Sequence, residues 1–322
     1  MLLSSLWRVQ TVTDLDAPPW PSRRSVITIG AYDGVHLGHQ AVIDHVRERA
    51  ESLGAMSVVV TFDRHPASVV RPESAPRLLT STEQKMELLA ATGLDAVVVV
   101  PFDEHQAAET PESFVERVLV KCLDTQVIVV GDDFHFGRHR DGNVYLLRKL
   151  GDEFDFDVEP LPLIPRADGV DEPVSSTAIR RALAGGDITR ANAMLGHPFE
   201  ARGPVVTGDQ RGRLLGFPTA NVEVSNLMSL PADGVYAGWY ERPGGEVHPC
   251  AINLGRRPTF YEHADSSLLE AHLLDFDDDL YAEQASVRFT HFLRSERKFD
   301  GVDALIAQLA VDIEHARTVL GI

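Results

Sequence analysis

Short apolar runs alternate with amphipathic stretches along the first half of the chain. The runs begin at residues 26, 57, 95 and 126 and read VITIG, SVVVTF, DAVVVVPF and QVIVVG. They are rich in β-branched residues and apolar along most of their length, which suits strands that are covered on both faces. Helical patterns lie near residues 39–53, 82–92 and 111–121. This rhythm predicts a doubly wound parallel sheet built from βαβ units.

The pattern changes after Pro198. Strand-like pieces separated by Gly and Pro turns follow, namely GPVVTG, GVYAGWY, VHPCAINLG, LLEAHLLDF and ASVRFTHFL. Such spacing predicts an antiparallel β-barrel or sandwich. An apolar stripe along residues 302–320 predicts a terminal helix, with Asp300 and Asp303 as candidates for its N-terminal cap. A chain of 322 residues exceeds the usual size of one hydrophobic core. We therefore expect two domains, residues 1–196 and 197–322.

Charge and cysteine content argue against several classes of protein. The formal net charge is −18, which disfavours a nucleic-acid partner because such surfaces need a surplus of Lys and Arg. Cys122 and Cys250 are the only cysteines, so neither a disulfide framework nor a cysteine zinc site is expected. The N-terminal MLLSSLW is too short for a signal-peptide core, and no later run reaches membrane-spanning length. We expect a cytoplasmic protein with no membrane partner, and small anions remain possible ligands.

The stretch GAYDGVHLGH, residues 30–39, joins the first predicted strand to the first predicted helix. Its start lies at the carboxyl edge of the sheet, where open α/β sheets bind ligands. A helix N-terminus favours an anion through its unbonded N–H groups and its dipole. His36 and His39 are three residues apart, so both rings can point at one anion as donors. The stretch suits an oligophosphate, and a Gly-rich turn whose histidines cap the helix or face solvent is the open alternative.

Six motifs resemble, in order, those of bacterial bifunctional riboflavin kinase/FAD synthetases. Residues 30–39 resemble the nucleotidylyltransferase signature G-x-F-D-G-x-H-x-G-H, with Tyr32 in place of the usual Phe. VVVTFDRHP, from Val58, resembles T-F-D-P-H-P, with Arg64 in place of Pro. GDDFHFGRHRDGN, VSSTAIRRAL, GRLLGFPTANV and NLGRRPTF begin at residues 131, 174, 212 and 253. The resemblance implies two activities: ATP phosphorylates riboflavin to FMN, and a second ATP adenylylates FMN to FAD with release of pyrophosphate.

For the first half, the resemblance implies an adenylyltransferase site. The attacking phosphate of FMN is already an oxyanion, so the protein has to align two polyanions and stabilise charge on the leaving pyrophosphate. His36 and His39 are the implied catalytic residues. The implied ATP-binding residues are Gly30, Asp33, Gly34, His36, His39, Ser176, Thr177 and Arg180, and the implied FMN-binding residues are Asp63, His65 and Asp133. The hydroxyls of the S-S-T motif also fit a helix N-cap, which is compatible with phosphate binding.

For the second half, the resemblance implies a riboflavin kinase whose general base is Glu270. The attacking group is a neutral hydroxyl, so a nearby carboxylate is useful. A strand places Glu270 on a face with Leu268 and Leu274, where a carboxylate is costly unless it is paired or lines a site. An ion pair with an arginine is the alternative. The implied ATP-binding residues are Gly212, Gly216, Phe217, Pro218, Thr219, Asn221 and Asn253.

Thr219 and Asn221 are also the implied Mg²⁺ ligands. Their hydroxyl and amide oxygens are hard ligands of the kind that suits a Mg²⁺ ion bridging phosphates. The alternative interpretation is a Pro-centred turn that Asn221 caps.

Three further questions stay open in the sequence. Tyr32 and Arg64 depart from the family pattern, so a chain with only one of the two activities is one alternative, and a non-catalytic flavin-binding regulator is another. Phe134 and Phe136 fit either flavin contacts or core positions at the sheet edge. The DFDDDLY segment alternates aspartates, but Leu280 stands where an EF-hand loop needs Gly. We expect an acidic turn there.

Overall fold

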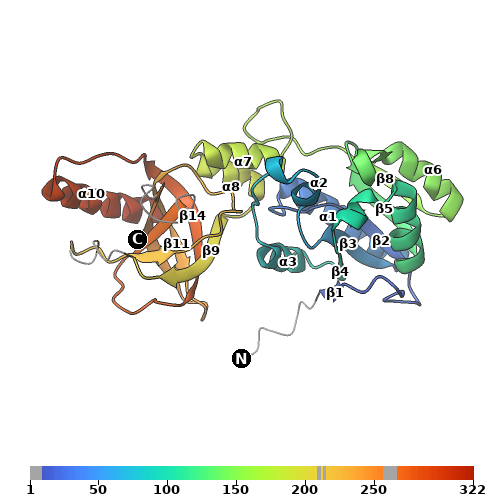
Figure 1. The fold of residues 1–322 in the computed structure, drawn as a ribbon, viewed down its shortest axis with the longest axis horizontal. Helices are drawn as coiled ribbons and strands as arrows, with labels where there is room; N and C mark the ends of the chain where they lie inside the picture. Colours follow the sequence, from blue (N-terminus) through green and yellow to red (C-terminus); the bar gives the residue numbers. More distant parts are fainter. Residues whose placement is uncertain (1–8, 209–211, 213–214, 257–266) are drawn as a thin grey trace. The chain divides into compact units, whose positions relative to one another are not determined.

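The structure, a computed structural model, describes residues 9–208, 212, 215–256 and 267–322. The chain forms two compact units, Met1–Val174 and Ser175–Ile322 (Figure 1). The helices that follow Val174 therefore group with the second unit, whereas the sequence predicts a boundary at residue 196. The predicted boundary at residue 196 separates the two expected activities, and it stays a prediction.

A six-stranded parallel sheet forms the centre of the first unit. The strands follow the order β1-β4-β3-β2-β5-β8, and every neighbouring pair is parallel (Figure 1). They are β1 (Gln10–Val12), β2 (Ser25–Ile29), β3 (Met56–Phe62), β4 (Ala96–Val100), β5 (Thr125–Gly131) and β8 (Asp157–Leu161). From β2 the chain builds toward β4 on one side and toward β8 on the other, so the order reverses between β2 and β5. Ligands of open α/β sheets bind beyond the carboxyl ends of the strands at such a switch point.

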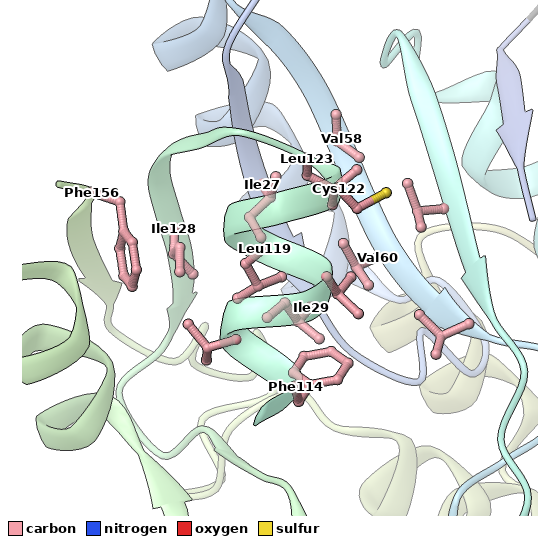
Figure 2. Close-up of a cluster of buried hydrophobic side chains, with 14 of the residues drawn as sticks. Ile27, Ile29, Val58, Val60, Phe114, Leu119, Cys122, Leu123, Ile128 and Phe156 are labelled. Carbon is pink, nitrogen blue, oxygen red and sulfur yellow. The ribbon is translucent and has the colours of Figure 1, made fainter. Parts of the chain in front are cut away.

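Helices cover both faces of this sheet, which confirms the predicted doubly wound fold. The helical segments are α1 (Leu37–Leu53), α2 (Ala67–Val70), η1 (Pro72–Ser74), α3 (Thr82–Ala91), α4 (Glu104–Ala108), α5 (Pro111–Phe114), the π-helical η2 (Val115–Cys122), η3 (Arg138–Arg140) and α6 (Val144–Phe154). On one face, strand residues Ile27, Val58 and Ile128 pack against Phe114 and Leu119 (Figure 2). Leu119 belongs to η2 and Phe114 to α5, so these two segments form one layer over the sheet.

The opposite face of the sheet carries α1 and α3. Val59 and Val97 of the strands pack against Leu89 of α3, and Val26 packs against Val46 of α1. Neighbouring strand residues thus enter opposite layers, as the two-residue period of a strand requires. Both layers are apolar, which explains why the strand sequences are apolar along most of their length.

A closed antiparallel barrel forms the centre of the second unit. Its strands follow the order β10-β13-β12-β11-β14-β9, and β9 also pairs with β10. They are β9 (Phe199–Val206), β10 (Ala220–Val222), β11 (Gly234–Glu241), β12 (Val247–Arg256), β13 (Ser267–Leu273) and β14 (Gln284–Arg294). The buried rings of Phe199, Tyr236 and Phe289 pack together. The centroid of the Phe289 ring lies 5.9 Å from that of Phe199 and 5.3 Å from that of Tyr236. This closure confirms the predicted barrel and excludes the sandwich.

In the described part of the second unit, α8 (Ile188–Leu195) and α10 (Val302–Leu320) pack on the barrel, and α7 (Ser176–Ala184) packs against α8. The Asn192 side chain of α8 donates to the Phe289 carbonyl oxygen at 2.8 Å and accepts from the Phe199 N–H at 2.8 Å. α8 is therefore fixed to β14 and β9. The terminal helix α10 packs its Ala316 against Ala237 and Leu274 of the barrel unit.

The predicted cap of α10 is wrong. Gly301 is the N-cap residue, with a φ of 152°, and no side chain caps the helix. Asp303 instead lies in the first helical turn, where the helix dipole favours a negative charge.

The DFDDDLY segment joins β13 to β14, and its carboxylates bind arginines of the same unit. Asp275 pairs with Arg317 of α10 at 2.7 Å, and Asp278 pairs with Arg242 of the barrel at 3.0 Å. Hydrogen bonds lower the pKa of both carboxyl groups: Asp275 accepts from Arg317, and Asp278 accepts from the backbone N–H of Asp279 and from Arg242. The segment is thus an acidic turn held by ion pairs, as predicted.

Candidate active sites

The loop between β2 and α1 is fastened to residues 79–80 by Asp33. Its Oδ1 accepts hydrogen bonds from the backbone N–H groups of Leu79 at 2.9 Å and Thr80 at 3.1 Å, and the side chain is buried. The Thr80 hydroxyl accepts from the Gly34 N–H at 3.1 Å. Asp33 therefore shapes the loop, and its predicted contact with ATP stays a prediction. Gly34 has a φ of 84°, which favours glycine at this turn.

The two histidines lie together at the start of α1. Their rings stack with centroids 3.6 Å apart and planes inclined by 17°. His36 is the N-cap residue, and its Nδ1 accepts from the His39 N–H at 3.4 Å. A Cβ on Gly38 would come within 3.1 Å of the His36 ring, so glycine leaves room for this stacking. Capping and ligand binding are thus both available to His36, and the capping interpretation is confirmed.

His39 has a buried polar atom near the N-terminus of α1. Within the described part of the chain, its Nδ1 is buried and has no hydrogen-bond partner. Burial, together with the neighbouring His36, holds the pKa of His39 well below its ordinary value of 6.5. His39 is therefore neutral at neutral pH. When a phosphate anion binds nearby, the unbonded nitrogen can take up a proton and donate a hydrogen bond to a phosphate oxygen.

Tyr32, the departure from the usual Phe, is accommodated inside the fold. Its ring lies 4.8 Å from the His39 ring, and its hydroxyl donates to the Thr28 Oγ1 at 2.7 Å. Tyr32 and Thr28 are both buried. The extra hydroxyl therefore has a partner in β2 and leaves the stacked histidines in place.

An open cavity lies at the carboxyl ends of β2 and β3. It is lined by Ala31, Asp33, Asp63, Arg64, His65, Leu78, Thr80, Thr82 and Lys85. Asp63 Oδ1 accepts from the Phe102 N–H at 2.8 Å, while Oδ2 lies 3.3 Å from the Arg64 guanidinium. His65 Nδ1 accepts from the Ala67 N–H at 3.1 Å. The structure thus brings two of the predicted FMN residues, Asp63 and His65, into one cavity.

Asp133, the third predicted FMN residue, is exposed just beyond β5, and it is not one of the residues that line this cavity. Phe134 and Phe136 stack at 5.5 Å, and Phe136 lies in the hydrophobic core. The core interpretation of Phe136 is therefore correct.

Lys85 on α3 is a cavity residue that sequence reasoning missed. It is only 7% exposed, and its Nζ donates to the Phe62 carbonyl oxygen at 2.8 Å, with longer contacts to the Thr61 Oγ1 at 3.3 Å and the Ala31 carbonyl oxygen at 3.4 Å. Burial lowers its pKa from the ordinary 10.5, although Asp33 and Asp63 act in the opposite direction. The available signal was its position: Lys85 precedes Leu89 by four residues, so a lysine occupies the inward face of the helix.

The S-S-T-x-I-R motif begins α7. Ser175 is the N-cap residue and accepts from the Ala178 N–H at 3.2 Å, as the capping interpretation predicted. Ser176, Thr177 and Arg180 lie in the first turns of this helix. They belong to the second compact unit, and their predicted contact with ATP stays a prediction.

In the second unit, Glu270 lies between two asparagines on neighbouring strands. Glu270 of β13 is in register with Asn221 of β10 and with Asn253 of β12. Residues paired in this way lie on the same face of a sheet, and the Asn253 Nδ2 donates to the Glu270 Oε2 at 3.3 Å. Among the described residues, Glu270 forms no ion pair with an arginine, so the structure does not support the ion-pair interpretation.

The GRLLGFPTANV segment is fastened beside this row of side chains. The Phe217 N–H donates to the Gly212 carbonyl oxygen at 2.8 Å, and His272 of β13 lies 2.7 Å from the Pro218 carbonyl oxygen through its Nδ1. Gly216 has a φ of 86°. A Cβ on Gly208 would lie 2.5 Å from the Asn221 amide, so glycine permits a close approach there. Residues 209–211 and 213–214 of this loop, and residues 257–260 of NLGRRPTF, lie outside the described residues.

The fold and the two sites together indicate a class of enzyme. A cavity at the carboxyl ends of parallel strands near a helix N-terminus, and a barrel site with a carboxylate beside polar side chains, are typical of enzymes that transfer groups from nucleotides.

Comparison with known proteins narrows this class. The FAD synthetase family model matches residues 19–178, and the riboflavin kinase family model matches residues 195–320. The bifunctional riboflavin kinase/FMN adenylyltransferase of Escherichia coli K12 is 39% identical over 302 residues, which are 94% of this chain and 95% of that protein. The protein of the same name from Listeria monocytogenes is 37% identical over 299 residues, 92% and 93% of the two chains. This chain belongs to the bifunctional riboflavin kinase/FMN adenylyltransferase family.

The fold of this chain is similar to that of a solved structure over nearly its whole length. The structure titled macrolide-efflux protein from Streptococcus pneumoniae has a TM-score of 0.84 and 29% identity, and it covers 96% of this chain and 98% of that one. No helix in the part of this chain that the structure describes is long and apolar enough to cross a membrane. With domains of both kinds, the chain is an enzyme of flavin-coenzyme synthesis that has riboflavin kinase and FMN adenylyltransferase activities.

Proposed function

We propose that residues 1–196 carry the adenylyl transfer and that residues 197–322 carry the phosphoryl transfer. ATP is the donor in both steps, so that riboflavin becomes FMN in the barrel and FMN becomes FAD in the sheet domain. The observation that carries this division is the match of one family model to each half of the chain. The structure supports it further, because Asp63 and His65 line one cavity of the sheet unit, whereas Asn221, Glu270 and Asn253 lie in register on strands of the barrel.

In the adenylyl transfer, the phosphate of FMN attacks the α-phosphorus of ATP and pyrophosphate leaves. We assign the phosphates of ATP to His36 and His39, with Gly30, Asp33 and Gly34 forming the loop around them. This role is supported by the buried His39 Nδ1, which has no partner in the described residues, and by the helix N-terminus beside it. The anionic charge of ATP favours protonation of His39, which then donates hydrogen bonds to the leaving group.

The remaining assignments of this step follow the family motifs. Ser176, Thr177 and Arg180 bind ATP, with Arg180 as a forked donor to phosphate oxygens. Asp63, His65 and Asp133 bind FMN. The cavity at the ends of β2 and β3 supports the roles of Asp63 and His65.

In the phosphoryl transfer, Glu270 takes the proton of the riboflavin 5′-hydroxyl as that oxygen attacks the γ-phosphorus of ATP. The row Asn221–Glu270–Asn253 supports this role, because Asn253 orients the carboxylate by a hydrogen bond. The other ATP-binding residues are Gly212, Gly216, Phe217, Pro218, Thr219, Asn221 and Asn253.

The donor set fits Mg²⁺ at this site. Asn221 is 7% exposed and offers an amide oxygen, and Thr219 two positions earlier offers a hydroxyl. Both are hard oxygen donors, and Mg²⁺ is commonly held by few protein ligands together with phosphate oxygens. Bound Mg²⁺ would neutralise the negative charge of the phosphates. Thr219 and Asn221 would hold the ion.

One experiment tests the two-step function. Purified protein is incubated with riboflavin, ATP and Mg²⁺, and the products are separated by chromatography. We expect FMN to appear and FAD to follow. If only FMN forms, the chain has kinase activity without adenylyltransferase activity, which is the alternative suggested by Tyr32 and Arg64. If no product forms, the result favours a non-catalytic flavin-binding regulator. The bonded hydroxyl of Tyr32 supports the two-step result.

We also propose that the enzyme acts in the cytoplasm on small molecules alone. Cys122 and Cys250 are both free and buried, which fits a reducing compartment. The net charge of −18 opposes a nucleic-acid partner.

A further inference from the structure

A buried ammonium group lies beneath the cavity at the ends of β2 and β3. Lys85 reaches this position from α3, and its three N–H donors face three oxygens: the carbonyls of Ala31 and Phe62 and the Thr61 hydroxyl. Ala31 follows β2, and Phe62 ends β3. One side chain therefore binds the ends of both strands, and these ends carry the loops with Asp33 and Asp63.

The charges that line the cavity make this ammonium important for an anionic ligand. Asp33 and Asp63 contribute two carboxylates, and both interact electrostatically with Lys85. Arg64 is the other cation, but its side chain is 59% exposed, so that solvent screens its charge. Without Lys85, two carboxylates would face the cavity against one screened guanidinium. A phosphate dianion would then be repelled.

We propose that Lys85 is a positioning residue for FMN in adenylyl transfer: its ammonium joins the ends of β2 and β3 and offsets the carboxylates of Asp33 and Asp63, so that the cavity admits the phosphate of FMN. This inference rests on the proposed adenylyltransferase site. Lys85 acts through the strand ends and through its charge, because its own donors already face protein oxygens.

The test compares Lys85→Met with Lys85→Arg in the full chain. Methionine keeps the length and the apolar stem but removes the charge, and we expect the KM for FMN to rise by about tenfold to hundredfold. The rate of riboflavin phosphorylation stays near the wild-type value, and in adenylyl transfer the KM for ATP rises less than the KM for FMN. Arginine restores the charge and recovers part of the loss. Lys149→Met, at an exposed lysine of α6, is the matched control and leaves all constants unchanged.

A pH profile of the wild-type enzyme tests the same idea without a substitution. The titratable and charged groups that line the cavity together with Lys85 are Asp33, Asp63, Arg64 and His65. Because burial lowers the pKa of Lys85 below its ordinary 10.5, its charge is lost and the KM for FMN rises as the pH increases toward 10.5. The profile of the Lys85→Met variant is flat.

Three results would overturn the inference. They are a flat wild-type profile, unchanged KM for FMN in Lys85→Met, and an equal loss of kcat and affinity for both substrates, which would mean that Lys85 only supports the fold. Failure of the wild-type enzyme to make FAD from supplied FMN is a different outcome. It would reject the proposed adenylyltransferase site itself, on which the inference rests.

Discussion

Replacing Glu270 with glutamine removes the proposed base and keeps the shape of its side chain. Asn253 Nδ2 donates to Glu270 Oε2 at 3.3 Å, and the amide oxygen of glutamine can accept the same hydrogen bond, so we expect little loss of stability. General-base catalysis typically contributes about 10²- to 10⁴-fold in rate. At about 1.4 kcal/mol per factor of ten, the barrier to riboflavin phosphorylation rises by about 3 to 5.5 kcal/mol.

The assay measures two reactions with one preparation of the full chain. Riboflavin, ATP and Mg²⁺ give FMN, and supplied FMN with ATP gives FAD, both separated by chromatography. The Glu270→Gln enzyme loses the first reaction and keeps the second, and Glu314→Gln, at an exposed residue of α10, keeps both. Wild-type FMN formation by the Glu270→Gln enzyme would refute the role of Glu270. An equal loss of both reactions would refute the division of the activities between the two halves.

The remaining predictions concern the first unit. His39→Ala lowers FAD formation from supplied FMN by about 10²-fold or more and leaves FMN formation unchanged, and normal FAD output would remove His39 from the site. Since the pKa of folded His39 lies below 6.5, unfolding takes up a proton, and stability falls as the pH drops through about 6.5, by at most about 1.4 kcal/mol per pH unit. Urea unfolding of His39→Gln at several pH values should lack this part of the slope. Tyr32→Phe loses the 2.7 Å hydrogen bond to Thr28 and about 1 kcal/mol of stability in a thermal melt, whereas Tyr145→Phe, at a residue that is 80% exposed, changes nothing.

The sequence predicts the central strands better than the edge strands. β2, β3, β4 and β5 lie within the sheet and are buried on both faces, so continuous apolar runs mark them. β1 and β8 form the two edges of the sheet. An edge strand needs less apolar sequence and tolerates proline, as Pro160 in β8 shows. Such strands carry little of the pattern on which the prediction depends.

The predicted sites divide in a similar way. His36 and His39 are close in sequence, so their spacing and the helix start suffice to place them together. The contacts of Asp33 with Thr80 and of Lys85 with Ala31 join segments that are far apart in sequence. Their partners depend on tertiary packing, which no local pattern specifies. The row of Glu270 and its two asparagines depends likewise on the register of three strands.

Closure of the barrel has a consequence for how the chain folds as the ribosome makes it. The last strand of the parallel sheet ends at Leu161, so this half can fold while the rest is still being translated. β9 pairs with β14, from Phe199 with Phe289 to Pro204 with Gln284. The barrel can therefore close only after nearly the whole chain has been synthesised. A nascent chain that stops short of β14 would expose open strand edges that pair readily with other chains. Translation arrest within the second half, before β14 (Gln284–Arg294) is made, would therefore leave a finished sheet joined to unpaired barrel strands that are prone to aggregate.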